Sequence, residues 1–542
     1  MKKVLCALLL AGPASLMAQV PTTEVPLTPE AAASIVAFYN HGETIRLNGD
    51  SRVAAGSELS GNVALLEGTL EIAGRVRGDL VIINGDIVIE SGAHVDGTLT
   101  VVGGGLRGVE HLTATSVVRH HERLKYELRD GDLVLMREVR SDELSVGREF
   151  AFGRTDLNIS VRGGYNRSEG LPVNIGARIH LGHRNPTLLD ARFIYRSAVG
   201  LDFDDDDFGY VLTAEQFIGG RRAARAGFRY ANEVLPVEAW GLSDRENSLA
   251  AFVLHRDYRD HFVRDGWSAF VAAGRSGMPL DWRIEYGNYE FRSAALRDPF
   301  SLLHNDDDWR AEVLVAPVRL HTLQSQVQYD TRNEDHDPSS GWLVRGAAEL
   351  ALSLRSGSAA DFSRHYRYGL LDARRYARLS PRARLSLRAV AAGSIDGKAL
   401  PAYRQQSLGG EGSLPGYELH DFDCGGHDST LNGSDYVPYY GCDRLLLFQL
   451  EYQSDFRWLS GIGGNVGRDF GLLDNIKWVL FFDTGRTWAE REARGNRGLG
   501  SDDFVADAGF GLRFGPLGAY WAVPLSANRG GMNFFVRLGP RI

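Results

Sequence analysis

Two cysteines and two histidines gather near residue 430 and could form either a covalent or a metal-bound crosslink. Cys424 and Cys442 are 18 residues apart, and His420 and His427 lie close to the first of them. A disulfide that closes a loop of this size stabilises a folded chain by about 3 kcal/mol in the chain-entropy model. Zinc is the alternative, but two cysteines and two histidines at these spacings match no zinc pattern well. The residues therefore predict a Cys424–Cys442 disulfide and no metal site.

Other clusters of polar residues could bind a metal ion or could simply be exposed to solvent. The acidic runs Asp204–Asp207 and Asp306–Asp308 could bind calcium or cation-bridged lipopolysaccharide, or form solvated turns. His120 and His121 could bind a metal, but a solvated linker is the simpler interpretation. The sequence contains neither a nucleophile elbow nor a zinc-protease motif. We therefore assign no catalytic residue, cofactor or enzymatic activity.

The N-terminus places the chain in an oxidising compartment. Lys2 and Lys3 precede an apolar stretch from Val4 to Leu10, and small residues follow up to Ala18. This pattern predicts a signal peptide over residues 1–19, because the apolar stretch is too short for an uncleaved membrane anchor. Export favours the disulfide. The net charge of -9 argues against nucleic acid as a partner.

A glycine-framed repeat follows the signal peptide. Residues 20–44 are predicted to be a linker with one short helix, and residues 45–112 contain Gly61–Gly68, Gly78–Gly85 and Gly97–Gly104 at offsets of 17 and 19 residues. Short strands at a regular period are typical of a β-solenoid, here of about three turns. We expect Leu80, Ile82, Leu99 and Val101 to point inward, and Val81 and Thr100 outward. Residues 113–160 are predicted to be a second linker.

Residues 161–542 show the pattern of membrane strands. Segments of about ten residues alternate in hydrophobicity and are separated by turn residues or charged loops. An even number of strands places both ends of such a barrel on one side of the membrane. Sixteen strands are predicted; they begin near Leu171, Leu188, Phe208, Ala223, Ser248, Phe262, Pro279, Leu320, Trp342, Tyr366 and Arg384, and then span Leu445–Tyr452, Lys477–Phe482, Val505–Phe514, Ala519–Leu525 and Asn533–Leu538.

Two resemblances add to this interpretation. Leu408–Asp423 (LGGEGSLPGYELHDFD), followed by FFDTG at Phe481–Gly485 and by Gly509–Leu525, resembles the outer-membrane-protein-85 superfamily, also called the bacterial surface antigen family, of BamA- and TamA-like barrels. The resemblance implies an all-β fold with a sixteen-stranded transmembrane β-barrel, whose sixth extracellular loop enters the lumen. The N-terminal repeats resemble bactofilins, which implies a small right-handed β-solenoid. A plug or spacer and a self-associating scaffold are both compatible with it.

The superfamily resemblance singles out the tip of the long loop, Leu414, Pro415, Gly416 and Tyr417. In the superfamily an arginine at the second position pairs with the acidic residue of the strand that matches FFDTG, which is Asp483 here. Pro415 replaces that arginine, so we expect Arg513 to pair with Asp483 or Glu451 instead. Strand alternation places Glu451, Asp483 and Arg513 in the lumen, and Phe448, Leu480, Phe482 and Phe510 toward lipid.

The predicted function is insertion or passage of protein or lipid at the bacterial outer membrane, with the N-terminal domain in the periplasm. Between Gln19 and the barrel the solenoid stands where polypeptide-transport-associated (POTRA) domains would lie, so this resembles a short member without them. The alternative is a structural or pore-type barrel that anchors a periplasmic β-helix scaffold. Expected partners are outer-membrane lipids, lipopolysaccharide, and either protein clients or scaffold proteins. The sequence does not determine the client or the oligomeric state.

Overall fold

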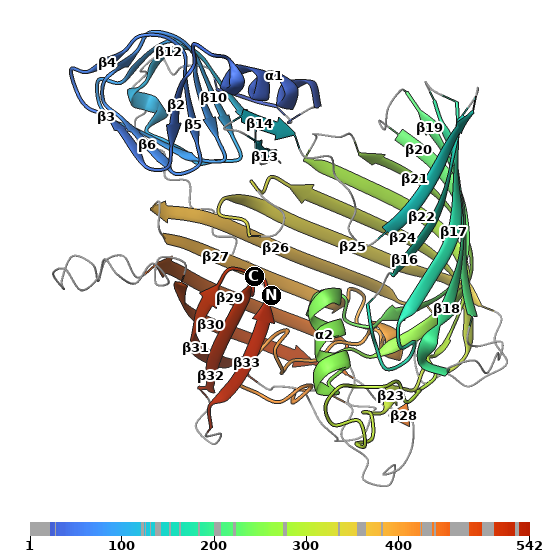
Figure 1. Cartoon of the computed structure of the whole chain (residues 1–542). Helices are drawn as coiled ribbons and strands as arrows, with labels where there is room; N and C mark the ends of the chain where they lie inside the picture. The colour runs from blue at the N-terminus through green and yellow to red at the C-terminus, as the bar shows by residue number, and fades with distance from the viewer. Residues whose placement is uncertain are drawn as a thin grey trace, which may run out of the picture. The chain divides into compact units, whose positions relative to one another are not determined.

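The structure is a computed structural model (Figure 1). It contains two compact units, Met1–Arg137 and Glu138–Ile542, which are considered separately. It describes residues 22–25, 27, 29–120, 124, 126–129, 132–135, 143–150, 153–161, 164–182, 185–199, 208–219, 224–274, 279–333, 337–354, 365–380, 383–422, 424, 436–437, 441–455, 476–489, 503–525 and 531–542. The signal peptide, Asp204–Asp207, His121 and His427 lie outside these residues.

The N-terminal unit is a parallel β-solenoid of about four turns, one more than the repeats predict. One sheet has the strand order β1-β12-β10-β8-β5-β2, and a second has the order β11-β9-β6-β3. The elements of this unit are β1 (Thr22–Glu24), α1 (Pro29–Asn40), β2 (Ile45–Asn48), β3 (Ser51–Val53), β4 (Glu58–Leu59), β5 (Val63–Leu66), β6 (Thr69–Ile72), β7 (Arg75–Val76), β8 (Leu80–Ile83), β9 (Asp86–Ile89), β10 (His94–Val102), β11 (Leu106–Arg107), β12 (Thr113–His120), β13 (Tyr126–Arg129) and β14 (Asp132–Leu135).

The repeat period sets the register of the stack. Val63 pairs with Leu80, Leu80 with Leu99, and Leu99 with Val117, so equivalent residues of successive turns lie on top of one another. Side-chain oxygens join the turns: Asn62 accepts from the Asp79 N–H at 3.0 Å, and Asp79 accepts from the Thr98 N–H at 2.8 Å. Leu80, Ile82, Leu99 and Val101 are fully buried in the interior, as predicted.

A second apolar cluster covers the outer face of the larger sheet. Val81 is only 5% exposed and packs in a cluster with Ile35 and Tyr39 of α1 and with Leu133 of the β13–β14 hairpin. The prediction that Val81 faces solvent is therefore wrong. The two predicted linkers are also corrected: residues 29–40 form a helix that packs on the solenoid, and residues 113–161 contribute β12, the hairpin and two strands of the second unit. The alternation of side chains along a strand identifies its two faces, but it does not show whether another element packs on the outer face.

Charging Val81 should therefore unfold the N-terminal unit as effectively as charging Ile82. Val81→Lys buries an ammonium group under α1, whereas Val88→Lys places one on the outer face of β9, where Val88 is half-buried and pairs with Glu71. In a fragment spanning residues 20–137, chemical denaturation should show a loss of several kcal/mol for the first variant and about 1 kcal/mol or less for the second. Equal stabilities would contradict the covered outer face.

The second unit is one antiparallel sheet with the order β15-β16-β17-β18-β19-β20-β21-β22-β24-β25-β26-β27-β29-β30-β31-β32-β33. The sheet from β16 onward has sixteen strands, which is the predicted number, and β15 adds one more at the edge. The strands are β15 (Glu143–Phe150), β16 (Gly153–Val161), β17 (Pro172–Leu181), β18 (Thr187–Arg196), β19 (Phe208–Ile218), β20 (Ala224–Pro236), β21 (His261–Gly274), β22 (Leu280–Ser293), β24 (Val318–Asp330), β25 (Gly341–Leu354), β26 (Arg367–Ser380), β27 (Ala383–Ser394), β29 (Arg444–Asp455), β30 (Ile476–Trp488), β31 (Val505–Phe514), β32 (Leu517–Pro524) and β33 (Asn533–Leu538).

The predicted number of barrel strands agrees with the structure because two differences cancel. The strand predicted near Ser248 is helix α2 (Asp244–Leu254), whose N-terminus has a capping box between Ser243 and Glu246. Conversely, β16 was assigned to a linker. The other predicted strands correspond to observed strands within a few residues. The Ser-x-x-Glu sequence at positions 243–246 was the local signal for the helix.

The two faces of the sheet differ in polarity. On β31, Phe510, Leu512 and Phe514 are 41–52% exposed on the outer face, whereas the alternate residues Asp507 and Arg513 are buried on the inner face. The long connections lie at one end of the sheet, and they include α2 and the short strands β23 (Glu312–Val313) and β28 (Tyr436–Val437), which pair with each other. No helix among the described residues is long and apolar enough to cross a membrane.

Candidate functional site

The loop between β27 and β29 is built on its glycines. Gly409 has a φ of +115°, and a Cβ there would lie 2.1 Å from the Glu418 carbonyl oxygen. This allows the chain to fold back on itself, and isolated bridges join Leu408 to Phe422 and Gly410 to Leu414. Leu414 and Tyr417 are buried in one apolar cluster.

The tip of this loop is bonded to the inner face of the sheet. The Gly416 N–H donates to Asp507 Oδ2 at 2.5 Å, and the Tyr417 hydroxyl donates to the Ala506 carbonyl at 2.9 Å. The Pro415 carbonyl accepts from the Asn533 side chain at 3.2 Å. A Cβ on Gly416 would lie 2.7 Å from that of Asp507, so only glycine allows this approach. The tip thus contacts both β31 and the edge strand β33.

Tyr417→Ala should destabilise the barrel more than Pro415→Ala. The tyrosine loses a buried ring, which lies 4.9 Å from Phe422, together with its hydroxyl hydrogen bond, whereas the proline contact is made by a backbone carbonyl that alanine retains. Truncation of a buried aromatic side chain costs about 3–5 kcal/mol. The measurement is the urea concentration at which half of the barrel is unfolded in detergent. Unfolding is followed on gels by the change in migration between unheated and heated samples. A larger loss for Pro415→Ala would show that the tip is held in another way.

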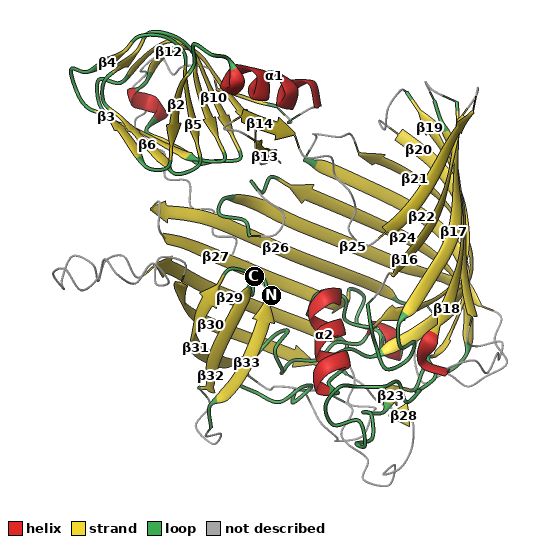
Figure 2. Cartoon of the chain, viewed as in Figure 1, coloured by secondary structure: helices red, strands yellow, loops and turns green. Residues whose placement is uncertain are grey.

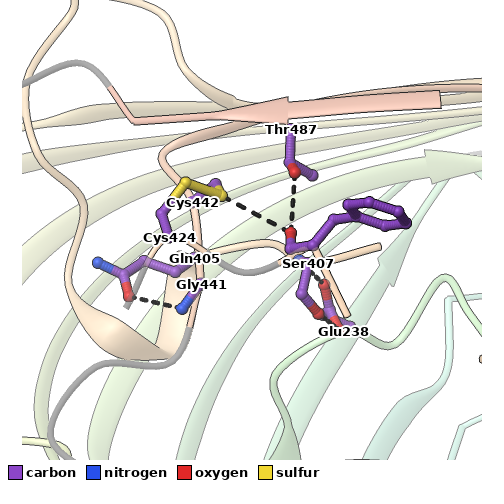
Figure 3. The surroundings of a disulfide bond; sticks show 8 residues. Glu238, Gln405, Ser407, Cys424, Gly441, Cys442 and Thr487 are labelled. Carbon is purple, nitrogen blue, oxygen red and sulfur yellow. Dashed lines mark hydrogen bonds between the residues drawn. A yellow bond between two sulfur atoms is a disulfide. The ribbon is translucent and has the colours of Figure 1, made fainter. Parts of the chain in front are cut away.

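The Cys424–Cys442 disulfide is confirmed, with the two Cα atoms 4.8 Å apart (Figure 3). Both residues are buried. Gln406 and Cys442 exchange two backbone hydrogen bonds of 2.9 and 2.6 Å, and Thr487 of β30 donates to the Phe422 carbonyl. The crosslink therefore joins the two arms of the loop next to the sheet. His420 lies 3.8 Å from the carboxylates of Glu238 and Asp260.

The predicted lumenal ion pairs require a correction. Asp483 is fully buried, but its cation is Arg541, near the C-terminus, and not Arg513. Arg513 instead pairs with Asp337 at 3.1 Å and donates to Gln453 at 2.8 Å. Glu451 is 1% exposed, and its nearest cation is Arg384 at 3.9 Å.

The register explains why Arg513 cannot reach Asp483. Asp483 pairs directly with Asp507 across the strands, and Arg513 lies six residues further along the same strand. At about 3.3 Å per residue this separation is roughly 20 Å. Alternation predicts the face of a residue but not its height in the barrel.

Arg541 is held by aromatic rings as well as by charge. Its guanidinium lies 3.7 Å from the centroid of Phe481, and Tyr520 and Phe535 complete the surrounding cluster. Arg541 is 1% exposed. No strand pattern extends past Leu538, so the sequence alone gave no reason to place this arginine in the lumen.

Arg541→Met should destabilise the barrel by about 3–5 kcal/mol, because it leaves the Asp483 carboxylate buried without its cation. Adding Asp483→Asn should recover part of the loss, since no unpaired charge remains. Arg375→Met, at an arginine that stacks on Trp342 at 5.2 Å, is the control. Urea unfolding in detergent measures these three variants, Asp483→Asn alone and the unmodified protein, and simple additivity of the two changes would contradict the pairing.

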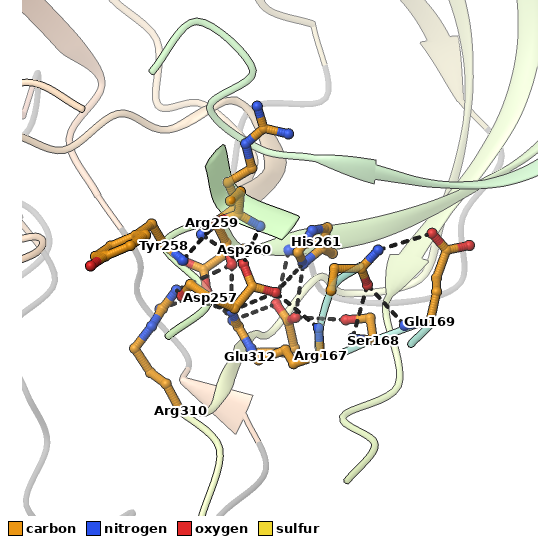
Figure 4. Close-up of polar contacts among 12 residues, drawn as sticks. Arg167, Ser168, Glu169, Asp257, Tyr258, Arg259, Asp260, His261, Arg310 and Glu312 are labelled. Atoms are coloured by element: carbon orange, nitrogen blue, oxygen red, sulfur yellow. Dashed lines mark hydrogen bonds and ion pairs between the residues drawn. The ribbon is translucent and has the colours of Figure 1, made fainter. Parts of the chain in front are cut away.

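Sequence reasoning missed a second buried ionic cluster, centred on Arg167 in the β16–β17 loop (Figure 4). The Arg167 guanidinium contacts Asp260 and lies 3.0 Å from Glu312, and its backbone N–H donates to Asp257 at 2.9 Å. All four residues are 5% exposed or less. Burial alone would raise the pKa of the Asp260 carboxyl, but Arg310 and Arg167 outweigh it and hold the pKa below its usual range. The cluster joins three separate connections at the long-loop end.

An antiparallel sheet of this size, apolar outside and ionic inside, defines an outer-membrane β-barrel protein. Residues 316–539, about two fifths of the chain, match the Omp85 superfamily domain.

Solved structures with a similar fold come from three bacteria. BamA from Haemophilus ducreyi lacking POTRA domains 1–3 is 15% identical, with a TM-score of 0.43 over 72% of this chain and 70% of that chain. CdiB from Escherichia coli is 13% identical, with a TM-score of 0.33 over 77% and 66%. CdiB from Acinetobacter baumannii is 11% identical, with a TM-score of 0.31 over 75% and 61%. No curated protein sequence matches the chain.

Proposed function

We propose that this barrel inserts or passes protein or lipid at the outer membrane through the seam between its edge strands. The proposal rests on the two edge strands of the sheet, which each pair with one neighbour. Among the described residues, β33 pairs only with β32, and β15 pairs only with β16. β33 has six residues, whereas β25 has fourteen. A short unpaired edge strand is the natural place for a barrel wall to open or to accept another strand.

The N-terminal unit serves in this proposal as a periplasmic module. Of the sixteen strands from β16 onward, the first begins and the last ends at the end of the sheet with the short turns, which is the periplasmic end of such barrels, whereas the additional edge strand β15 begins at the other end. β1 pairs with β12 and covers the edge of the solenoid through which copies could stack. This contact supports a spacer or plug over an end-to-end polymer. The relation to bactofilins stays a prediction.

The alternative is a barrel that anchors a periplasmic scaffold, and depletion in the native bacterium separates the two functions. Loss of the protein should lower the amounts of other outer-membrane proteins or of lipopolysaccharide several-fold, as measured by quantitative proteomics and lipid analysis of isolated outer membranes. A complementing copy without residues 20–137 tests the N-terminal unit. Altered cell shape with unchanged membrane composition would contradict the proposed function and favour the anchor.

A further inference from the structure

Helix α2 lies beside the edge strand β33, at the seam of the sheet (Figure 2). It belongs to the connection between β20 and β21, yet it contacts the connections of the first strands as well as the last strand. One side of α2 packs closely against the β16–β17 loop, whereas the other side makes few contacts with β33.

The side toward the β16–β17 loop is closely packed. The Tyr165 N–H donates to Ser248 Oγ at 2.7 Å, and the Tyr165 ring lies 5.3 Å from that of Phe252. A Cβ on Gly164 would lie 2.9 Å from the Ser248 side chain. Asn247 of α2 binds Asp257 at 2.9 Å, and Asp257 accepts from Arg167 in the same loop. Buried hydrogen bonds and ring contacts therefore fix α2 to the first strands.

The side toward β33 is hollow apart from one ionic contact. A cavity of about 550 Å³ separates Ala250 and Leu254 of α2 from Phe534–Val536 of β33. Below it, Glu246 accepts from Arg537 at 2.5 and 3.2 Å and from the Leu538 N–H at 3.2 Å. Arg537 also donates to the Glu411 carbonyl of the long loop at 3.0 Å. Glu246 thus makes three hydrogen bonds to the end of β33.

We propose that α2 is the releasable closure of the barrel seam: it stays attached to the β16–β17 loop and lets β33 move away when the Glu246–Arg537 contact breaks. The inference rests on the proposed function, because it supplies the step that would control opening of the same seam. Arg537 links this step to the long loop, since one side chain binds both Glu246 and Glu411.

Two pairs of spin labels in the full-length protein test the proposal. Cys6 is replaced by serine, and Cys424 and Cys442 remain in their disulfide. Labels at Ile159→Cys and Val536→Cys, which are 51% and 52% exposed on β16 and β33, report the width of the seam. Labels at Leu249→Cys, 46% exposed on α2, and Ile159→Cys report whether α2 stays with the first strands. Distances are measured by pulsed electron paramagnetic resonance in lipid nanodiscs.

Glu246→Gln should raise the population with a wide seam about tenfold, while the Leu249–Ile159 distance stays unchanged. Glutamine keeps the shape of the side chain and the capping box but removes the charge. Arg537→Gln should have a similar effect, and the double variant should add little, because both changes break the same contact. Glu290→Gln, whose partner Arg319 lies 2.6 Å away on the neighbouring strand β24, is the matched control and should leave the seam closed.

An unchanged seam width in both Glu246→Gln and Arg537→Gln would overturn the proposal. A longer Leu249–Ile159 distance would also overturn it, because α2 would then move with β33. Neither result depends on an effect on membrane composition. Failure of the closure is therefore distinguishable from failure of the proposed function, which the depletion experiment tests.

Discussion

A sheet that crosses a membrane must pair its backbone groups, because lipid offers no hydrogen-bond partner for an exposed N–H or C=O. In the part of the chain that the structure describes, each strand of the barrel sheet from β16 to β32 pairs with two neighbours, and the edge strands β15 and β33 pair with one. Three segments contact the edge strand β33: the tip of the long loop at Asn533, helix α2 at Arg537, and the C-terminal segment where Arg541 lies over the Phe535 ring. The edge is thus held from inside the barrel by side chains.

Ion pairs also form on the inner face of the sheet, some of them buried and some partly exposed. Asp483 depends on Arg541, and Arg513, Arg384 and Lys477 share Asp337. A buried ion pair contributes little net stability, but the loss of one partner is strongly destabilising, so such pairs fix geometry more than they add stability. The cluster around Arg167 has the corresponding role at the long-loop end, where it ties three connections together. The cavity beside β33 is lined by residues of α2 and by Phe534–Val536.

In the N-terminal unit, the apolar outer face of the solenoid is covered by other elements. A solenoid strand has an inner and an outer face, and here both faces of the larger sheet are apolar. α1 and the β13–β14 hairpin cover the outer one, and Asn40 fixes the hairpin through hydrogen bonds of 2.8 Å to the Leu133 backbone in both directions. β1 occupies the edge of β12. The unit is therefore covered on one face and at one edge.

The sequence by itself determined the features that depend on local pattern. Alternation gave the barrel strands and their two faces, the glycine frame gave the stacking period of the solenoid, and the spacing of Cys424 and Cys442 in an exported chain gave the disulfide. These features are local because side-chain direction repeats every two residues in a strand, and equivalent residues of the solenoid recur at a nearly fixed interval. Even so, a capping box at Ser243 begins a helix where a strand is predicted, and β16 lies mostly within a predicted linker.

Only the tertiary structure decided which distant residues meet. Arg541 replaces Arg513 as the partner of Asp483, because strand register sets the height of each residue and the chain end turns back into the lumen. Val81 is buried because a helix far along the chain covers it, and Arg167 is buried because three connections converge on it. Contacts between residues that are distant in the sequence depend on the register of the strands and on the course of the loops. A periodic pattern within a short segment specifies neither of these.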